Sequence, residues 1–217
     1  MNNEVLILDD LISRYPDLLP CKEQIINAFQ ILKYCFENKN KLVIAGNGGS
    51  SSDAEHIVGE LMKSFKKKRN LSSNFVMELK KIDNGKGSEL AKYLQNPLPA
   101  ISLSSHQSLN TAIINDISNG GEFAFAQQLL GLGLRGDVFL AISTSGNSKN
   151  LIYAAIVAKA KGMKVIGLTG KDGGQLKNYS DTSVIVQSNE TYLIQERHLP
   201  IYHCLCLMLE DHFFPNK

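Results

Sequence analysis

Five short apolar runs rich in β-branched residues, separated by segments with helical spacing, constrain the fold of this chain more than any other feature. They lie at 42–45, 100–103, 138–142, 164–168 and 183–186. Strands that are apolar throughout are typical of a parallel sheet covered on both faces. Right-handed crossovers place helices on each face. The sequence therefore predicts an α/β fold, a three-layer αβα sandwich with a mostly five-stranded parallel sheet.

The helical segments suggest how the rest of the chain is organised. Apolar spacing predicts helices at 4–14 and 21–37, and further helices at 51–64, 148–161, 172–178 and in the C-terminal stretch. We interpret 1–217 as a single domain with an N-terminal helical hairpin at 1–40. Residues 65–98 interrupt the rhythm as an inserted helical excursion, with short helices near 75–81 and 88–95. A lid, an interface arm and a surface ornament are all open interpretations of it.

The composition narrows the classes of partner. A net charge of +2 argues against nucleic acid or an acidic membrane as the main partner, and we interpret the basic run at 66–69 as a solvated loop. Four cysteines without a C-x-x-C pair are typical of buried thiols in a reducing compartment. No apolar run approaches the ~18 residues of a membrane span. We expect a soluble, cytoplasmic protein that binds neither nucleic acid nor membrane.

Two loops rich in Ser and Gly, at 46–52 and 143–148, follow the first and third predicted strands and precede helices. Helix N-termini at the carboxyl ends of parallel strands offer unpaired N–H groups to an anion, and Ser and Thr hydroxyls donate to phosphate oxygens. Turns and N-caps explain either loop alone equally well, but two at equivalent strand ends favour a phosphate ester. The Walker A and G-x-G-x-x-G patterns are absent, which disfavours a nucleotide.

A possible acid/base or metal group follows the first loop. His56 and Glu60 lie four residues apart on one predicted helix, and Gln195 and His203 lie on the C-terminal helix. Beside a phosphate site, such groups suit proton transfer on a sugar carbon or a divalent metal, although a surface helix pair is the alternative. Gln195 and His203 are about 12 Å apart along a straight helix. Both reach one ion if Pro200 kinks the helix or if a neighbouring subunit lends one of them, and we favour the second.

Six motifs in order carry a resemblance to a known family. They are G-N-G-G-S (46–50), D-A-x-H-x-x-x-E (53–60), N-D (115–116), S-T-S-G-N-S (143–148), L-T-G-K-D-G-G (168–174) and Q-E-x-H-x-x-x-x-H (195–203). Together they resemble bacterial phosphoheptose isomerase, which has the sugar-isomerase (SIS), flavodoxin-like fold. The resemblance runs from the N-terminal helices to the C-terminus and is interrupted at 65–98.

The resemblance implies an activity and a set of site residues. It implies a homotetramer with active sites at subunit interfaces, which converts sedoheptulose 7-phosphate to D-glycero-D-manno-heptose 7-phosphate through an enediol(ate), for cell-envelope or capsule sugars. Glu60 and His203 would transfer protons, and a zinc ion would be held by His56, Glu60, Gln195 and His203. The substrate contacts implied by the match are Asn47, Gly48, Gly49, Ser50, Glu60, Asn115, Asp116, Ser143, Thr144, Ser145, Ser148 and Gln195.

Two departures from the family pattern leave the sugar open. Ser64 stands where the family usually carries Arg, so Lys63 or Lys66 would have to supply a cation, and Tyr192 stands where Asp is common. One alternative is therefore an isomerase of another phosphosugar, such as a pentose 5-phosphate. The other is a non-catalytic SIS module that binds a sugar phosphate or a protein, like the bacterial protein that associates with the initiator DnaA.

Overall fold

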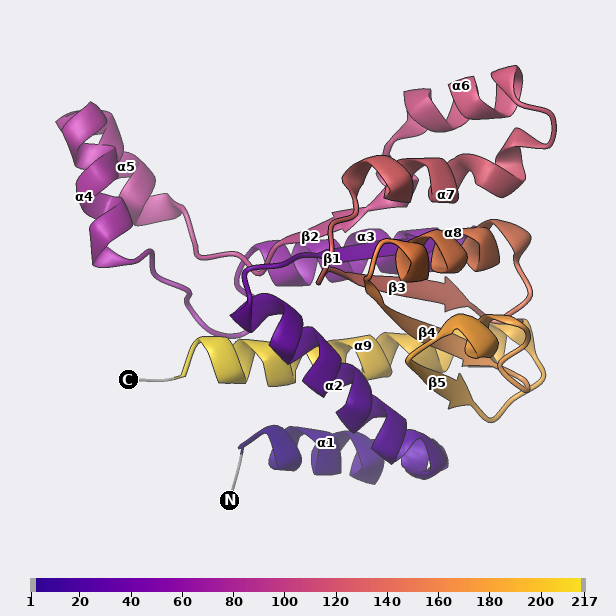
Figure 1. The fold of residues 1–217 in the computed structure, drawn as a ribbon. Helices are drawn as coiled ribbons and strands as arrows, with labels where there is room; N and C mark the ends of the chain where they lie inside the picture. Colours follow the sequence, from indigo (N-terminus) through magenta and orange to yellow (C-terminus); the bar gives the residue numbers. More distant parts are fainter. Residues whose placement is uncertain (1–2, 216–217) are drawn as a thin grey trace.

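The computed structural model, which describes residues 3–215, contains one sheet of five parallel strands in the order β2-β1-β3-β4-β5 (Figure 1). The strands are β1 (Leu42–Gly46), β2 (Ala100–Ser102), β3 (Val138–Ser143), β4 (Lys164–Gly170) and β5 (Thr182–Val186). The chain leaves β1 toward β2 on one side and returns to pair β3 on the other. The switch point between β1 and β3 is where open α/β sheets bind ligands. The predicted strands and parallel sheet are confirmed.

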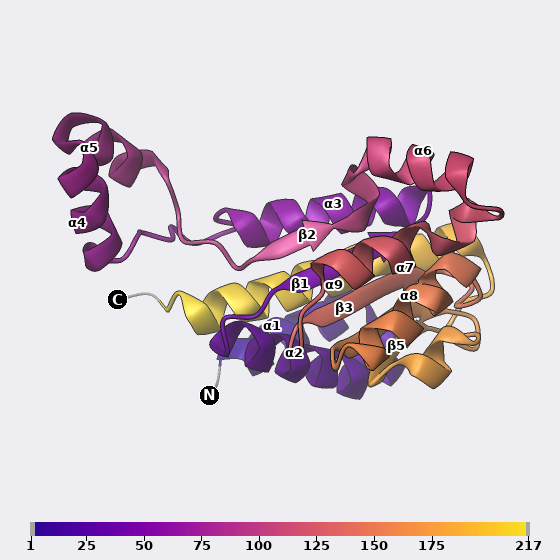
Figure 2. The ribbon, with the colours of Figure 1, turned by 45° about the horizontal axis from the view of Figure 1, so that its top comes forward.

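Helices cover both faces of the sheet and form two cores. One core includes α1 (Asn3–Arg14), α2 (Lys22–Glu37), α3 (Gly49–Met62) and α9 (Thr191–Phe213). The other includes α7 (Gly120–Leu132) and α8 (Lys149–Ala160). Side chains alternate along each strand, so Leu42 and Ile44 enter the first core and Val43 and Ala45 the second. The three layers of the predicted sandwich are therefore present (Figure 2).

Three segments differ from the expected elements. Helices α6 (Gln107–Asp116) and α7 lie outside the segments predicted to be helical. The helix expected at 172–178 is a loop followed by a 3-10 turn, η3 (Leu176–Tyr179), because Gly173 and Gly174 both have positive φ. Two further 3-10 turns, η1 (Pro16–Cys21) and η2 (Leu103–Ser105), join neighbouring elements.

Two predictions from the composition, on the state of the cysteines and on membrane-spanning segments, can be compared with the structure. The four cysteines are buried and free of disulfides, as expected. Within residues 3–215, no helix combines the length and apolarity needed to cross a membrane.

The inserted excursion forms a helical hairpin, α4 (Ser73–Ile82) and α5 (Asn84–Tyr93), which stands away from the sheet (Figures 1 and 2). Ser72 and Asp83 cap its two helices through their side chains. Gly87 is the only buried residue within the two helices. Several large apolar side chains of the excursion are exposed: Phe75, Met77, Ile82, Leu90, Tyr93 and Leu94. At its base, the backbone N–H of Asn96 donates to the Arg69 carbonyl, so the two chain ends lie close together.

This isolation predicts that the sheet domain folds without the hairpin. Replacing residues 72–94 with a short Gly/Ser linker removes little buried surface, so we expect the thermal unfolding midpoint to fall by less than about 4 °C, roughly 1 kcal/mol for a chain of this size. Circular dichroism at increasing temperature measures it. A loss of cooperative unfolding would show that the hairpin supports the core after all.

Candidate active site

The first loop makes a sharp turn between β1 and α3 that depends on glycine. At Gly46 a Cβ would overlap the backbone of Ser50, and Gly48 has φ 55° and ψ −123°, a conformation that L side chains rarely adopt. Because α3 begins at Gly49, the positive end of its dipole lies at this loop. Ser50 is buried, and its N–H donates to the carbonyl of Asn47, which closes the turn.

The second loop gathers hydroxyl groups at the N-terminus of α8. Ser143 Oγ and Ser148 Oγ lie 3.2 Å apart, and Ser145 Oγ accepts from the Asn147 backbone N–H at 3.2 Å. The Thr144 carbonyl accepts from Gly170 N–H, which fixes the loop against the end of β4. Ser148 is the N-cap of α8 but makes no side-chain capping bond. The Ser148 hydroxyl therefore makes no hydrogen bond to the backbone N–H groups at the start of α8.

An amide pair joins the two loops. Asn47 Nδ2 donates to Asn150 Oδ1 at 3.0 Å, and Asn150 Nδ2 donates back to Asn47 Oδ1 at 2.9 Å. Since β1 and β3 are neighbours, with Gly46 paired to Ile142, the loops lie side by side at the switch point. The prediction that both loops occupy equivalent strand ends is confirmed, and Asn150 is a site residue that the sequence analysis does not include.

A cavity of about 310 Å³ opens beside the first loop. Its lining includes Asn47, Gly48, Ser51, Ser104, Asn110, Ile114 and Asn150. Asn115 and Asp116, predicted to contact substrate, lie at the end of α6, exposed and bonded to each other at 2.9 Å. They are not part of the cavity lining, although Asn110 and Ile114 of the same helix are. Their substrate role stays a prediction.

His56, Glu60 and His203 come together where α3 packs against α9. His56 Nε2 lies 3.2 Å from Glu60 Oε1, and the rings of His56 and His203 meet edge to face with centroids 5.1 Å apart. Two polar atoms of this group are buried and lack a hydrogen-bond partner among residues 3–215: Glu60 Oε2 and His203 Nε2. The structure thus brings together three of the four predicted metal ligands and both predicted proton-transfer residues.

Burial shapes the protonation of this cluster. It lowers the pKa of His203, an effect that the neighbouring His56 reinforces and Glu60 opposes. The neutral imidazole is therefore favoured, as a ligand or a proton acceptor requires. Burial also raises the pKa of the Tyr202 phenol and of the Asp53 carboxyl beneath His56. The phenol stays protonated at neutral pH.

Gln195 lies apart from the other three predicted ligands. A Cβ on Gly49 would overlap Gln195 Nε2, which places this side chain at the first loop. α9 runs unbroken from Thr191 to Phe213 with Pro200 inside it, and it lies along α3 so that His203 meets His56 about 10 Å further on. Gln195 and His203 of one chain therefore occupy opposite ends of the α3–α9 contact.

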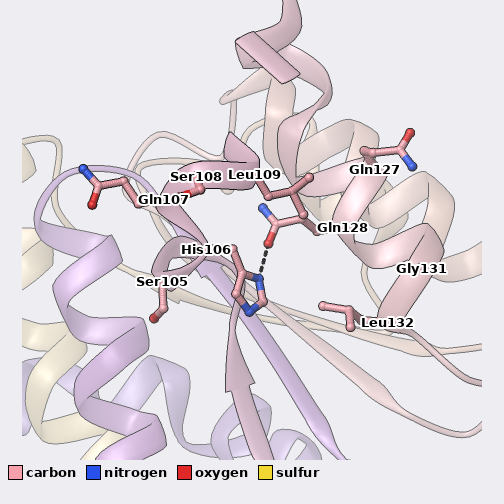
Figure 3. A pocket seen from close by; sticks show the side chains of 9 residues that line it. All are labelled: Ser105, His106, Gln107, Ser108, Leu109, Gln127, Gln128, Gly131 and Leu132. Carbon is pink, nitrogen blue, oxygen red and sulfur yellow. Dashed lines mark hydrogen bonds between the residues drawn. The ribbon is translucent and has the colours of Figure 1, made fainter. Parts of the chain in front are cut away.

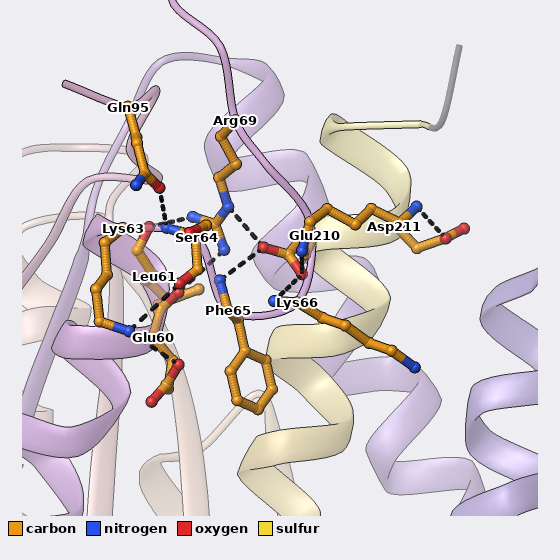
Figure 4. A network of polar contacts seen from close by, with 11 residues as sticks. Glu60, Leu61, Lys63, Ser64, Phe65, Lys66, Arg69, Gln95, Glu210 and Asp211 are labelled. Atoms are coloured by element: carbon orange, nitrogen blue, oxygen red, sulfur yellow. Dashed lines mark hydrogen bonds and ion pairs between the residues drawn. The ribbon is translucent and has the colours of Figure 1, made fainter. Parts of the chain in front are cut away.

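A buried ion pair ties the segment after α3, residues 63–69, here named the strap, to the end of α9 (Figure 4). Arg69 Nε lies 2.8 Å from Glu210 Oε1, with side chains 0% and 1% exposed. The guanidinium also donates to the carbonyls of Leu61 and Glu60, which α3 leaves unpaired at its C-terminus. The interpretation of 66–69 as a solvated loop is wrong for Arg69.

Glu210 completes this network. It accepts from the backbone N–H groups of Phe65, Lys66 and Lys67 at 2.8, 2.8 and 3.0 Å. Burial alone would raise the pKa of Glu210, but these N–H donors and Arg69 outweigh it and hold the pKa below its usual range. Glu210 is therefore an ionised structural anchor for the strap.

The two lysines considered as a substitute cation lie on different sides of the strap. Lys63 Nζ lies 3.6 Å from Glu60 Oε2 and 3.3 Å from the Ser64 carbonyl. The Lys66 side chain extends away from Glu60 (Figure 4). Between the two, the geometry favours Lys63 as the cation beside Glu60.

A second cavity of about 750 Å³ lies away from this cluster, between η2, α6 and α7 (Figure 3). His106 is the only ionisable side chain in its lining, and its Nδ1 is bonded to Gln128 Oε1 at 2.6 Å. Gln128 in turn donates to Asn110 at 2.7 Å. Because these polar groups bond to one another and no carboxylate lines the cavity, we place the candidate active site at the loops and the histidine cluster.

The donor set fits a divalent metal such as zinc. Two imidazoles and a carboxylate are typical zinc ligands, and His56 Nε2 and Glu60 Oε1, 3.2 Å apart, match the separation of about 3.4 Å between two ligands of one tetrahedral ion. Glu60 Oε2, which lies 3.6 Å from Lys63 Nζ, and His203 Nε2 are buried and have no hydrogen-bond partner among residues 3–215. Within residues 3–215, no three His, Cys, Asp or Glu side chains are already arranged to enclose an ion.

Tyr202 and Asp53 are further residues of the cluster that the sequence analysis does not include. The Tyr202 hydroxyl lies 2.9 Å from His56 Nδ1 and donates to Asp53 Oδ1 at 3.2 Å. Asp53 belongs to the D-A-x-H motif, which is the one sequence signal for its position. Tyr202 resembles any other apolar residue of α9 in the sequence.

Comparisons with known proteins agree with this geometry. A family model described as the SIS domain matches residues 89–170, which include the second loop. The phosphoheptose isomerase of a Nitratiruptor species is 41% identical over 177 residues, 82% of this chain and 80% of that protein. That of a Helicobacter pylori strain is 38% identical over 218 residues, 95% of this chain and 98% of that protein.

Solved structures show the same likeness. The phosphoheptose isomerase of Neisseria gonorrhoeae superposes with a TM-score of 0.69 at 29% identity, covering 94% of this chain and 98% of that one. The phosphoheptose isomerase of Francisella tularensis gives the same TM-score and coverages at 31% identity.

The strap network predicts a large cost for breaking its ion pair. Arg69→Met leaves the Glu210 carboxylate buried without its cation, and we expect the free energy of unfolding to fall by about 3–5 kcal/mol. Lys68→Met removes an exposed cation from the same strap and should change it by less than about 1 kcal/mol. Urea denaturation measures both. Equal effects would contradict a specific role for Arg69.

Buried His198 predicts acid sensitivity. Its Nε2 donates to the Thr169 carbonyl at 3.2 Å, and burial lowers its pKa to about 4. Between pH ~6.5 and 4 the unfolded chain binds the extra proton and the folded chain does not. The free energy of unfolding therefore decreases as the pH is lowered, by roughly 3 kcal/mol at pH 4. His198→Gln keeps a donor but does not titrate. Its unfolding free energy should vary less over this range, whereas parallel wild-type and variant profiles would refute the assignment.

Proposed function

We propose that this chain, which belongs to the phosphoheptose isomerase family, converts sedoheptulose 7-phosphate to D-glycero-D-manno-heptose 7-phosphate. The residues described above carry out this reaction. The reaction moves a carbonyl group between C2 and C1 of a phosphorylated sugar, for the synthesis of heptoses. The observation that carries the assignment of the site is the pair of Ser/Gly loops side by side at the switch point.

The loops are the phosphate end of the proposed site. The hydroxyls of Ser143, Ser145 and Ser148 meet the N-terminus of α8, where unpaired N–H groups and the helix dipole favour a dianion. Asn47 and Asn150 hold the first loop against the second. The carbon chain of the sugar then extends from these loops. Isomerisation of the open-chain sugar requires no nucleotide or redox cofactor.

Glu60 and His203 are the proton-transfer end. Glu60 removes a proton from C1, and the C1–H electron pair forms the C1–C2 double bond while the carbonyl electrons move onto the C2 oxygen. Neutral His203 takes the proton of the O1 hydroxyl and delivers it to the C2 oxygen, and the C1 carbonyl then forms as C2 receives the proton held by Glu60. The Glu60 oxygen without a hydrogen-bond partner and the neutral His203 support these roles.

A zinc ion is part of the proposal. His56, Glu60 and His203 would hold it, with Gln195 as a fourth ligand. When bound, the ion would stabilise the negative charge that develops on the enediolate oxygens. Lys63, beside Glu60, supplies a second positive charge from this chain.

The length of α3 supports active sites shared between subunits. Gly49, at the loops, and Glu60 lie about 16 Å apart along this helix. A sugar whose phosphate occupies the loops would have to pass along the packed side of α3 to meet Glu60 of the same chain. Pairing the loops of one subunit with Glu60 and His203 of another removes this conflict, and it also brings Gln195 and His203 from different chains. We propose a homotetramer of this kind, located in the cytoplasm, where the four thiols stay reduced.

The assay of the proposed function uses purified protein with sedoheptulose 7-phosphate and follows aldose formation with and without chelator. We expect turnover in the wild type, its loss in Glu60→Gln by at least about 100-fold, and a raised KM in Ser145→Ala/Ser148→Ala. Turnover of a pentose 5-phosphate, without turnover of sedoheptulose 7-phosphate, would assign the pentose phosphate as the substrate instead. No turnover of either sugar would favour a binding module.

Mixing Glu60→Gln with Ser145→Ala/Ser148→Ala, at a substrate concentration well below the raised KM, tests the shared site. Glu60→Gln subunits keep the loops and Ser145→Ala/Ser148→Ala subunits keep the carboxylate. After dissociation and reassembly, a shared site predicts that about a quarter of the sites contain both intact halves and regain activity. Sites built within single chains would regain none, and a fully active monomer would refute the proposal directly.

A further inference from the structure

Tyr202 holds an unusual position beneath the histidine cluster. It is 1% exposed, and its hydroxyl touches two polar atoms, His56 Nδ1 at 2.9 Å and Asp53 Oδ1 at 3.2 Å. Its ring packs edge to face against both His56 and His203, with centroids 5.5 and 5.0 Å away. The hydroxyl belongs to α9, whereas Asp53 and His56 lie one turn apart on α3.

The number of hydrogens that Tyr202 and Asp53 can donate determines which ring nitrogen of neutral His56 is protonated. A phenol has one hydrogen, and an ionised carboxylate can only accept. Because the Tyr202 hydroxyl donates to Asp53, its oxygen must accept from His56, so His56 Nδ1 carries a hydrogen. The neutral imidazole then has its lone pair on Nε2. That atom lies 3.2 Å from Glu60 Oε1, so the pair of acceptors has room for a cation or a shared proton between them.

We propose that Tyr202 and Asp53 are positioning residues that hold His56 in the Nδ1–H tautomer and aim its Nε2 lone pair at Glu60. Neither residue touches the substrate. Their catalytic effect rests on the proposed function, whereas their effect on the His56 tautomer does not. A tyrosine present only to fill the core would leave the tautomer free, since its packing depends on the ring and not on the hydroxyl.

The structure supplies two variants that act in different ways. Tyr202→Phe keeps the ring and removes the hydroxyl, so His56 Nδ1 loses its acceptor. Asp53→Ala removes the acceptor of the hydroxyl, so Tyr202 turns its hydrogen to His56 and forces the Nε2–H tautomer. Asp53→Asn keeps an oxygen acceptor and should preserve the wild-type tautomer. Tyr34→Phe makes the same chemical change at an exposed residue of α2 and is the matched control.

The direct test is nitrogen NMR of chelator-treated protein with labelled histidine at about pH 8, where an unperturbed His is neutral. Protonated and unprotonated ring nitrogens have well-separated shifts, and His56→Gln assigns the His56 signals among the five histidines. We expect Nδ1–H in the wild type, Asp53→Asn and Tyr34→Phe, with the Nε2–H form gained in Asp53→Ala and Tyr202→Phe. Wild-type protein in the Nε2–H form, or no change in both disruptive variants, would overturn the proposal.

The functional consequence is measured separately. We expect Tyr202→Phe and Asp53→Ala to weaken zinc binding, measured by competition with a chromophoric chelator, by about 10–100-fold. We expect kcat on sedoheptulose 7-phosphate to fall by a similar factor with KM little changed, because the phosphate loops are intact. Unchanged zinc affinity and kcat in both variants would overturn the positioning role. An inactive wild type with the expected NMR pattern would refute the proposed function and leave the tautomer assignment intact.

Discussion

The parallel alignment of α3 with α9 is the constraint on which the site depends. At one end Gly49 has no side chain, so Gln195 can lie against the first loop. At the other end Arg69 caps the open carbonyls of Glu60 and Leu61 and binds Glu210 on α9. Between these two ends, α3 packs against α9, and the ring of His203 meets that of His56 edge to face. His203 is therefore held against His56, and the histidine cluster forms at a fixed distance from the loops.

This alignment separates two chemical tasks within one chain. The N-terminal end of α3 carries the loops suited to phosphate, and its last two turns carry the groups suited to proton transfer. The helix dipole follows the same division, because its positive end lies at the loops while Glu60 lies near its negative end. One chain thus carries the Ser/Gly loops and the histidine cluster at opposite ends of one helix.

The sequence predicted what depends on local pattern. Apolar β-branched runs located the strands, and the loops at 46–52 and 143–148 followed because strand ends in a parallel sheet share an edge. What the sequence did not predict depends on tertiary contacts. Arg69 ends a run of three lysines, and only packing against Glu210 shows that it is buried. Tyr202 reads as another apolar residue of a long helix until Asp53 and His56 meet its hydroxyl.

Two glutamates on either side of the strap show how this fold separates stability from reactivity. Glu210 receives three backbone N–H groups and the Arg69 guanidinium, so its charge is fully compensated and its oxygens have no capacity left for chemistry. Glu60 has His56 on one oxygen, while its other oxygen is buried with no hydrogen bond from residues 3–215 and only Lys63 nearby. Burying an uncompensated carboxylate oxygen costs stability. The saturated network around Glu210 offsets that cost, because its Arg69 also bonds the carbonyls of Glu60 and Leu61 and so holds the backbone of the same helical turn.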